Sequence, residues 1–591
     1  MTTEAFSHYL QKLESTASRN EMTIILAELL DKASADEIDK ICYLILGELA
    51  PNYQRLQINL AEKMMVKILA FSFNKNEQDI QLLFKEKGDF GNIAYDLKQK
   101  KKEEVLVLSV TELYNRLVTI AGQGGLGSQD RKIKLFAELI DAVDAAMTKF
   151  LVRMPIGKLR LGFSNVTILD ALSWTAKGDK SLRPAIENGF NVCADIGLIA
   201  KTFKKGGVAA VKKISPKLGI PIRPALTERL PTVEKIFEKM GQPALEPKYD
   251  GFRVQIHFTK NHSSKNADHS LLFNQQKGSV NIFSRQMDNT TEMFPEIAAA
   301  AKTLPVSSVI LDGEAIGINI KTGHFLPFQE TAQRKRKYDI VQTAKNIPLK
   351  VFVFDVLYLD GVPLLTKPFY QRRKILEKVL EKMPKGSVIN LTPQAIVKTK
   401  KEFEKLFDKF VANGLEGVVC KKLTGIYRAG KRDFNWVKYK KAMQTHLIDT
   451  VDCVVMGYYK GKGKRSKFGI GAFLVGIWDK NKKEFLTIAK IGTGLTDDQW
   501  REIRKKVDDL KTEDKPKEYT VPKTLIPDVW AQPQIVVEII ADEISVSPIH
   551  TSGFALRFPR MERFRAKEPA DTTSVNEIKE LHKMQKNEAS R

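Results

Sequence analysis

Hydrophobic residues in the first 205 positions recur at steps of three and four, as in Ile24, Ile25, Leu26, Leu29 and Leu30. This spacing places apolar side chains along one face of a helix. Short polar or glycine-containing stretches, such as KEKGDFGN and GQGGLGSQD, separate the helical runs. The pattern predicts an all-α region. A linker rich in Gly, Pro and Lys is predicted to follow it from Lys204 to Pro224.

The pattern changes after Leu230, where β-rich runs appear at 252–258, 279–285, 308–319 and 349–361. Helical patterns at 370–383 and 401–414 lie between or after them, which is typical of an α+β domain. From about Leu447 onward short strands dominate and predict a small sandwich or barrel. The last segment, 574–591, is predicted to be a solvated helix that frays.

Composition narrows the class of protein. The chain has 591 residues, 43% hydrophobic and 28% charged, as in ordinary multidomain globular proteins. A formal charge of +25 favours a polyanionic partner, although a soluble protein can also simply be basic. Four widely spaced cysteines, no signal-peptide pattern and no apolar run of about 20 residues predict a soluble intracellular protein of the cytoplasm or nucleoid, with no membrane contact.

One glycine motif is a false lead. Gly122, Gly124 and Gly127 match the GxGxxG pattern of dinucleotide sites, but that pattern requires a preceding strand. The preceding run, VTELYNRLVTIA, is helical in its spacing. A glycine-rich turn between two helices, with backbone N–H groups able to meet a phosphate, is the better interpretation.

The segment Glu246-Pro-Lys248-Tyr-Asp250-Gly251-Phe-Arg253 carries the strongest chemical signal. A lone lysine is usually a surface residue, but a desolvated lysine near other cations can act as a covalent nucleophile. Arg253 is a candidate cation and phosphate contact, and Asp250 a candidate to orient the amine. Gly251 lets the backbone approach a ligand closely.

Further candidates follow in order along the chain. They are Arg285 in FSR, Asp312 and Glu314 in LDGEAI at a predicted strand end, Phe354 and Asp355 in FVFDVLYLDG, Glu416 and Lys421 in GLEGVVCK, and Arg432, Trp436, Lys438 and Lys440 in GKRDFNWVKYK. Each has an ordinary structural explanation by itself. Together they offer a nucleophilic lysine, carboxylates for a hard cation, an aromatic ring and several phosphate-directed cations, as attack at a nucleotide phosphate requires.

These motifs resemble, in identity and order, those of the covalent nucleotidyltransferase superfamily. Within it, the chain is similar to the three-domain ATP-dependent DNA ligases of archaea and eukaryotes. The stretches GKLRLGFSNVTILDAL and GIPIRPALTERL look like that family's helical DNA-binding domain and linker. VVEIIADEISVSP and ALRFPRMERFR look like its OB-fold β-barrel. The resemblance implies a helical DNA-binding domain with linker at 1–218, an α+β adenylation domain at 219–444, and an OB-fold domain with a C-terminal tail at 445–591.

The resemblance also implies roles for single residues. Lys248 would carry AMP, Glu246 would read the adenine amine and Phe354 would stack on the base. Arg253 and Glu314 would hold the ribose and phosphate region, with Arg285 near the phosphates or the nick. The other expected roles are metal binding by Glu314 and Glu416, phosphate neutralisation by Lys421, Arg432 and Lys438, and orientation of pyrophosphate by Arg560.

Two departures from the family pattern stand out. The last motif usually carries Arg-x-Asp-Lys after FPR, whereas this chain has Arg563-Phe-Arg565-Ala-Lys567 without the Asp, which leaves the role of Lys567 open. A polar insert from about Lys260 to Val280 is expected to be a surface hairpin loop. The stretch 99–108 lacks the paired aromatics of a clamp-binding box, so binding to a sliding clamp also stays open.

The implied activity is sealing of nicked duplex DNA with ATP and Mg²⁺, or Mn²⁺ in its place, by a monomer acting in replication, recombination and repair. RNA ligases and mRNA-capping guanylyltransferases share the lysine motif, but the large helical domain argues against both. A non-catalytic DNA-binding scaffold would require loss of the lysine or the carboxylates, and all are present.

Overall fold

The computed structural model describes residues 1–101, 107–157, 159–260, 279–336, 339–440, 450–461 and 469–588. The chain folds into two compact units. One contains residues 1–228, 239–396 and 421–437, and the other contains 229–238, 397–420 and 438–591. Among the described residues, no helix has the length and apolar character needed to cross a membrane.

Helices build the N-terminal part of the first unit, as the 3.6-residue periodicity predicts. They are α1 (Thr3–Ser15), α2 (Arg19–Lys32), α3 (Ile38–Leu44), α4 (Glu62–Ser72), α5 (Glu77–Lys87), α6 (Phe90–Lys100), α7 (Val110–Ala121), α8 (Ser128–Ala142), α9 (Ala145–Arg153), α10 (Asn165–Lys177), α11 (Arg183–Val192) and α12 (Ile196–Lys212). The glycine-rich stretch lies between α7 and α8, so the prediction of a turn between two helices is confirmed.

The predicted linker begins too early. α12 continues to Lys212 and is broken only locally at Gly206 and Gly207, where the backbone leaves helical values. Ile199, Phe203 and Val211 are buried on the inner face of this helix. Burial of that face keeps a Gly-containing, Lys-rich sequence helical, because tertiary packing outweighs weak intrinsic propensity.

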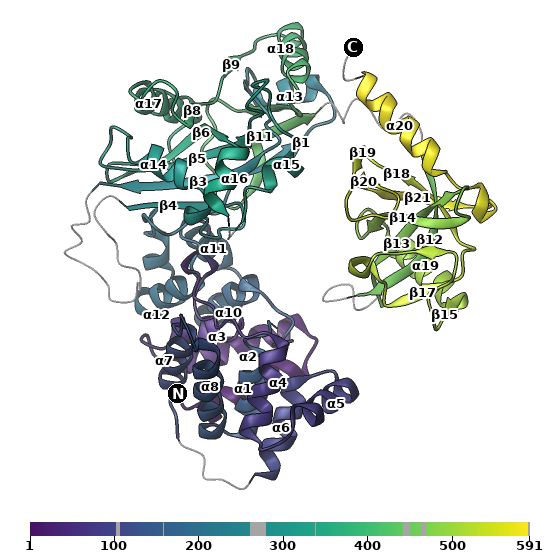
Figure 1. The fold of residues 1–591 in the computed structure, drawn as a ribbon. Coiled ribbons are helices and arrows are strands. Elements are labelled where there is room, and N and C mark those ends of the chain that lie inside the picture. The colour runs from purple at the N-terminus through teal and green to yellow at the C-terminus, as the bar shows by residue number, and fades with distance from the viewer. Residues whose placement is uncertain are drawn as a thin grey trace. The chain divides into compact units, whose positions relative to one another are not determined.

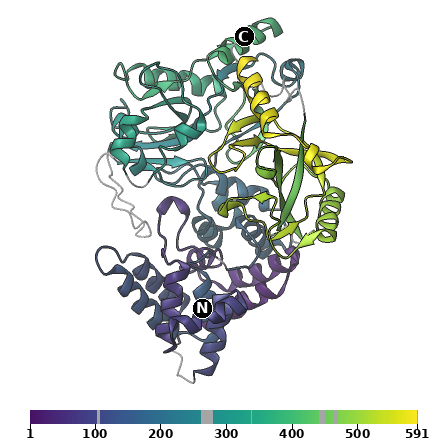
Figure 2. The same ribbon diagram turned by 45° about the vertical axis from the view of Figure 1, so that its right-hand side comes forward.

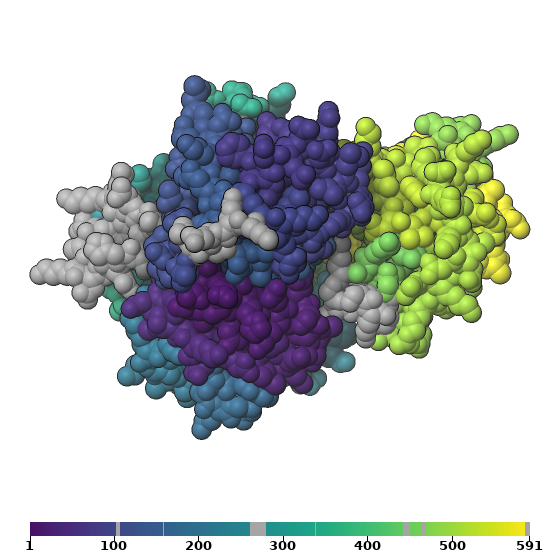
Figure 3. Space-filling model, turned by 90° about the horizontal axis from the view of Figure 1, so that it is seen from below, coloured from purple at the N-terminus to yellow at the C-terminus, as the bar shows by residue number. Residues whose placement is uncertain are grey.

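The apolar faces of these helices share one core. Segments far apart in the sequence lie side by side in it: α2 packs on α10, α6 on α9 and α3 on α12 (Figure 1). Figure 3 shows the purple N-terminal surface lying directly against blue, later parts of the helical region. Asp89 caps α6 and also accepts from Arg153 at the end of α9, with 2.9 Å between Arg153 Nη2 and Asp89 Oδ2. The KEKGDFGN stretch therefore ends one helix and begins the next, while its aspartate joins two helices.

A six-stranded sheet follows in the first unit, in the order β4-β3-β5-β6-β7 with β8 beside β6. Its strands are β3 (Phe252–Thr259), β4 (Ser279–Ser284), β5 (Ser308–Gly317), β6 (Leu349–Leu359), β7 (Val362–Pro363) and β8 (Ile389–Leu391). The helices around it are α14 (Pro295–Ala301), α15 (Phe328–Ala332), α16 (Ile340–Asn346) and α17 (Phe369–Glu381). α17 packs on β6 and β8, and α14 on β4 and β8 (Figure 1).

Asp312 and Glu314 lie in the middle of β5, not at a strand end as predicted. The LDGEAI run suggested a turn because Asp-Gly pairs favour turns. Here Gly313 lies between β3 and β6, and a Cβ at this position would approach Phe352 O to 3.0 Å. The glycine therefore permits close strand packing, and the register of β5 against β6 shifts between Asp312 and Gly313.

The remaining segments of the first unit include β1 (Leu226–Arg229), whose last residue belongs to the other unit, β2 (Ala244–Pro247) and β9 (Ala395–Ile396). β2 and β9 pair antiparallel. Two further strands, β10 (Gly417–Lys421) and β11 (Arg432–Lys440), each contribute residues to both units.

The second unit contains most of α13 (Val233–Met240), which belongs to it up to Glu238. It also contains α18 (Lys400–Ala412) and a strand-rich C-terminal region. An eight-stranded sheet runs β15-β17-β12-β13-β14-β16, and β18 pairs with β12 and β21. The elements are β12 (Val451–Lys460), β13 (Ile470–Asp479), β14 (Glu484–Ile491), α19 (Asp497–Asp509), β15 (Lys511–Thr512), β16 (Tyr519–Thr520), β17 (Val529–Ala531), β18 (Val536–Ile540), β19 (Glu543–Val546), β20 (Phe554–Arg557), β21 (Arg560–Arg565) and α20 (Val575–Glu588).

The C-terminal helix is more than a solvated tail. α20, the yellow C-terminal helix in Figure 2, packs on β13 and β19. Its residue Ile578 is fully buried. Within the predicted segment 574–591, the described residues Val575–Glu588 form a helix, and Val575, Ile578 and Leu581 pack against the core of the strand-rich region. The predicted polar insert near Lys260–Val280 lies almost entirely outside the described residues.

Candidate active site

Lys248 lies in the loop between β2 and β3, and its neighbours fix the course of that loop. Tyr249 stacks on Phe352 with ring centroids 4.3 Å apart, and Asp250 Oδ2 accepts from Phe328 N at 3.3 Å. Gly251 passes so close to β5 that a Cβ would come within 2.2 Å of Ala315 O. The KYDG sequence thus positions the half-buried lysine through ring stacking, one backbone contact and a glycine that no other residue could replace.

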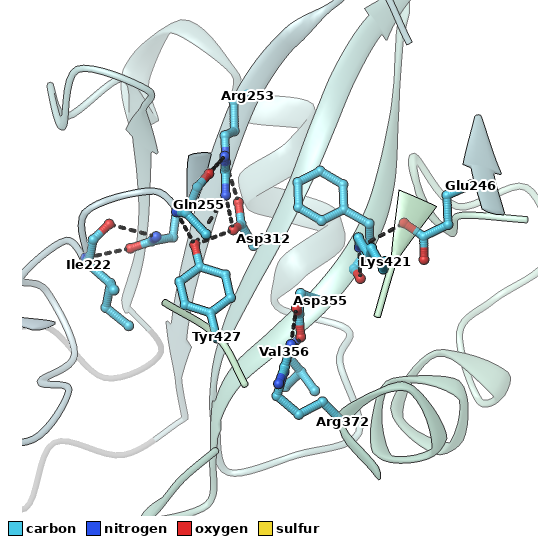
Figure 4. A network of polar contacts seen from close by, with 12 residues as sticks. Ile222, Glu246, Arg253, Gln255, Asp312, Asp355, Val356, Arg372, Lys421 and Tyr427 are labelled. Carbon is cyan, nitrogen blue, oxygen red and sulfur yellow. Dashed lines mark hydrogen bonds and ion pairs between the residues drawn. The ribbon is translucent and has the colours of Figure 1, made fainter. Parts of the chain in front are cut away.

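Arg253, on β3, is held by a ring of polar contacts (Figure 4). Its Nε lies 2.9 Å from Asp312 Oδ1, its Nη2 lies 2.5 Å from Asp312 Oδ2, and its Nη1 donates to Ala225 O at 2.8 Å. Tyr427 donates to Asp312 Oδ2 at 2.7 Å. Burial opposes the charge of the guanidinium, but the Asp312 carboxylate outweighs it, so the pKa of Arg253 lies above its usual value.

Lys421 and Glu246 form a second, drier cluster (Figure 4). Lys421 Nζ lies 2.7 Å from Glu246 Oε2 and donates to Phe354 O at 2.9 Å, and the two charged side chains are 1% and 2% exposed. The rings of Phe354, Phe369 and Trp436 surround this ammonium, with centroids 4.5–4.7 Å away. Burial lowers the pKa of Lys421, and the charge of Glu246 only partly opposes this.

Phe354, on β6, joins the two clusters. Its ring lies 4.6 Å from Lys421 Nζ and 5.4 Å from the Arg253 guanidinium carbon. The next residue, Asp355, forms a fully buried pair with Arg372 of α17, at 2.8 Å from Nε to Oδ1. That pair fixes the β6 backbone next to the aromatic ring, so Phe354 presents a half-buried face between two cations.

The other predicted residues of the first unit lie around these clusters. Glu314 faces Arg253 across the β3–β5 pairing and is half-buried. Arg285 is exposed in the turn after β4, and Arg432 is exposed at the start of β11. The structure therefore brings Glu246, Arg253, Glu314, Phe354 and Lys421 together.

The predicted residues of the second unit occupy separate places. Glu416, just before β10, lies 2.9 Å from Lys440 Nζ, and Lys438 is half-buried on β11. Arg560 at the start of β21 pairs with Asp542 at 2.8 Å. Lys567, from the altered last motif, pairs with Asp452 at 3.1 Å.

Sequence reasoning missed several residues that build these clusters. Tyr427, Arg372, Arg373 and Gln394 each contact a predicted site residue, yet none belongs to a recognised motif. The available signal was weak: RR at 372–373 sits in a helical run where basic residues usually face solvent. Their role became visible only through contacts across long stretches of sequence.

No group of three or more His, Cys, Asp or Glu side chains that could hold a metal ion occurs among the described residues. The chain pairs the candidate-site carboxylates of Glu246 and Asp312 with basic side chains instead. It offers a lysine loop beside a dry, aromatic-lined cluster of paired charges.

A helical N-terminal part, an adenylation domain and a strand-rich C-terminal region define the class of multidomain ligases. Three family descriptions match along the chain: "DNA ligase N terminus" at residues 2–173, "ATP dependent DNA ligase domain" at 271–440 and "ATP dependent DNA ligase C terminal region" at 466–568. The chain is 43% identical to "Probable DNA ligase" of Dictyoglomus thermophilum, over 98% of this chain and 97% of that protein. It is 36% identical to "DNA ligase" of Acidianus ambivalens, over 99% and 98%.

The chain belongs to the ATP-dependent DNA ligase family. It is an enzyme that uses ATP to join DNA, through the lysyl-AMP intermediate general to this family. The solved structure "Pmar-Lig_PreS3" is similar in fold, with a TM-score of 0.53 and 19% identity over 95% of this chain and 99% of that chain. Family membership sets aside the RNA-ligase, capping-enzyme and scaffold alternatives.

Proposed function

We propose that Lys248 is the residue that carries AMP, and that the two clusters beside it form the nucleotide site. The observation that carries this proposal is the buried Glu246–Lys421 pair beside the ring of Phe354. Glu246 lies on β2, two residues before Lys248 in the following loop, so the pair and the lysine belong to one short segment. Glu246 accepts from the adenine amine, Phe354 stacks on the base, and Arg253 meets the ribose and α-phosphate region.

The reaction proceeds in three group transfers. The neutral amine of Lys248 attacks the α-phosphorus of ATP. A P–N bond forms, the P–O bond to pyrophosphate breaks, and the amine loses its proton. The 5′-phosphate at a nick then attacks the same phosphorus and releases the lysine. Finally the 3′-hydroxyl attacks the activated 5′-phosphate, forms the phosphodiester bond and expels AMP. Arg285, Lys421, Arg432 and Lys438 supply positive charge for these steps.

Glu314 and Glu416 are proposed to bind Mg²⁺, with Mn²⁺ able to replace it. Both are half-buried oxygen donors, which suit a hard cation, and the absence of a larger ligand cluster among described residues fits an ion that arrives with the nucleotide. When bound, the ion neutralises charge on the phosphates.

The strand-rich C-terminal region is proposed to be an OB-fold, with Arg560 orienting the pyrophosphate. Asp542 pairs with the guanidinium of Arg560, which is half-buried at the start of β21. The contribution of Lys567 stays open, because Asp452 already pairs with it in the same region. The division into residues 1–218, 219–444 and 445–591 is part of this proposal.

The substrate is proposed to be nicked duplex DNA, bound by a monomer in the cytoplasm or nucleoid. The charge of +25 supports contacts to the phosphate backbone, so binding weakens steeply with salt and is nearly independent of sequence. Part of the 99–108 stretch lies outside the described residues, and clamp binding stays open.

ATP labelled at the α-phosphate tests the assignment of Lys248. Wild type, Lys248→Ala and the control Lys350→Ala, an exposed lysine on β6, are mixed with ATP and Mg²⁺ and then chased with nicked duplex. We expect stable label on wild type and the control only, and its release as AMP together with sealed DNA. Label on Lys248→Ala contradicts the assignment, and label that nicked DNA cannot discharge contradicts the proposed substrate.

A further inference from the structure

The carboxylate of Glu246 is enclosed by donors from three separate segments. Lys421 Nζ lies 2.7 Å from Oε2, while Gln394 Nε2 donates to Oε1 at 2.9 Å. Arg373 Nη1 lies 3.6 Å from the same Oε1. Because the Glu246 side chain is only 2% exposed, water cannot replace these partners.

The backbone places Gln394 opposite Glu246. β9 pairs with β2 through Leu245–Ala395 and Ala244–Ile396, and continuing this register by one residue sets Gln394 against Glu246. Thr392, two residues before Gln394, makes two hydrogen bonds through its backbone. Its N donates to Val353 O and its carbonyl accepts from Arg373 Nη1, both at 2.9 Å. Two residues before Gln394, the backbone is therefore anchored to β6, the strand that carries Phe354.

Only the amide nitrogen of a glutamine can donate to a carboxylate, so this contact sets the orientation of the Gln394 side chain. With one donor on each oxygen, the plane of the Glu246 carboxylate is fixed, and both oxygens keep a lone pair for a further donor. An ionised carboxylate only accepts. The edge of adenine that carries its amino group donates to it, whereas guanine presents a carbonyl oxygen at the same position.

We propose that Gln394 is a positioning residue that sets the Glu246 carboxylate for selection of adenine over guanine nucleotides. This inference rests on the proposed nucleotide site. Without Gln394, the Lys421 contact holds only Oε2, and Oε1 turns toward Arg373. The carboxylate of Glu246 is then no longer directed at the adenine amine, while Lys248, which attacks the phosphate, keeps its position.

Two substitutions separate the donor from the side-chain volume. Gln394→Met keeps a similar length without the donor, and Gln394→Glu sets a second acceptor against Glu246. The matched control is Gln342→Met, at an exposed glutamine on α16. Covalent labelling is followed over a range of ATP and GTP concentrations, which gives the half-saturating concentration and the maximal rate. Thermal unfolding of each variant is recorded alongside.

For Gln394→Met we expect the half-saturating ATP concentration to rise about tenfold, as for loss of one hydrogen bond to a charged group. The maximal rate stays near wild type and the preference for ATP over GTP falls. Gln394→Glu shows a larger loss because two acceptors face each other. Gln342→Met behaves as wild type.

Unchanged half-saturation and unchanged preference in both Gln394 variants overturn the inference. So does a variant that melts earlier and labels more slowly at every concentration with its preference intact, since that marks a purely structural role. If wild type takes no label, the proposed function fails first and this inference fails with it. If wild type labels normally and the variants match it, only this inference fails.

Discussion

Two sets of acid–base pairs, one around Glu246 and the other beside β12, β18 and β21, have different environments. The Glu246–Lys421 side chains are 2% and 1% exposed, whereas Glu538–Arg563 are 12% and 65% exposed and Asp452–Lys567 are 12% and 35% exposed. A buried charge depends on its partner, because water cannot compensate for its loss. Pairs that water reaches contribute little to stability. Charge pairing alone therefore does not identify a site; burial decides how strongly each charge depends on its partner.

The largest effect is expected for Lys421→Met. This change leaves the Glu246 carboxylate buried without its nearest cation, which costs about 3–5 kcal/mol of unfolding free energy. Urea unfolding and label uptake from ATP measure the loss of stability and of adenylation. The double variant Glu246→Gln/Lys421→Met removes the unpaired charge, so it should regain much of the stability while adenylation stays impaired. If Lys421→Met is as stable as wild type, the buried carboxylate of Glu246 does not depend on its lysine partner, and burial does not distinguish the two sets of pairs.

An intermediate effect is expected for Tyr427→Phe. The hydroxyl donates to Asp312 Oδ2 at 2.7 Å and accepts from Ala225 N at 3.1 Å, while the ring packs edge-on against Trp436. Loss of the hydroxyl costs about 1–3 kcal/mol because a buried carboxylate loses a donor and a backbone N–H loses its acceptor. The half-saturating ATP concentration should rise through displacement of Arg253. Normal ATP dependence would show that Arg253 keeps its position without the tyrosine hydroxyl.

The smallest effect is expected for Arg563→Leu, and it depends on pH. The hydrogen bond from Arg563 is the main reason why the pKa of Glu538 lies below its usual value. A carboxylate with a lowered pKa stabilises the folded state at pH values above the ordinary pKa of glutamate. This stabilisation is lost as the pH falls through the pKa of the group in the folded state. Between neutral pH and about pH 3, wild type should therefore lose slightly more stability than the variant. High salt should shrink the difference, and identical acid profiles at low salt would contradict it.

Local patterns predicted most elements of the fold. The runs 252–258, 308–319 and 349–361 correspond to β3, β5 and β6, and 401–414 corresponds to α18. The errors occurred where packing outweighs propensity. α12 continues through a sequence that resembles a linker, because its inner face is buried. Asp312-Gly313 resembles a turn, but it lies within a strand whose neighbours leave no room for a side chain.

By itself, the sequence determined the order of the helical, α+β and strand-rich regions, the lysine loop and the residue types of the proposed nucleotide site. These depend on periodicity and on short motifs, which act within a few residues of each other. Only the tertiary structure decided which side chains hold that site in place. Gln394 lies 148 positions from Glu246, and the pairing of β9 with β2 brings them close. Tyr427 lies 115 positions from Asp312, which it reaches from the loop between β10 and β11. Burial, which turns these contacts into fixed geometry, arises only when distant segments pack and exclude water.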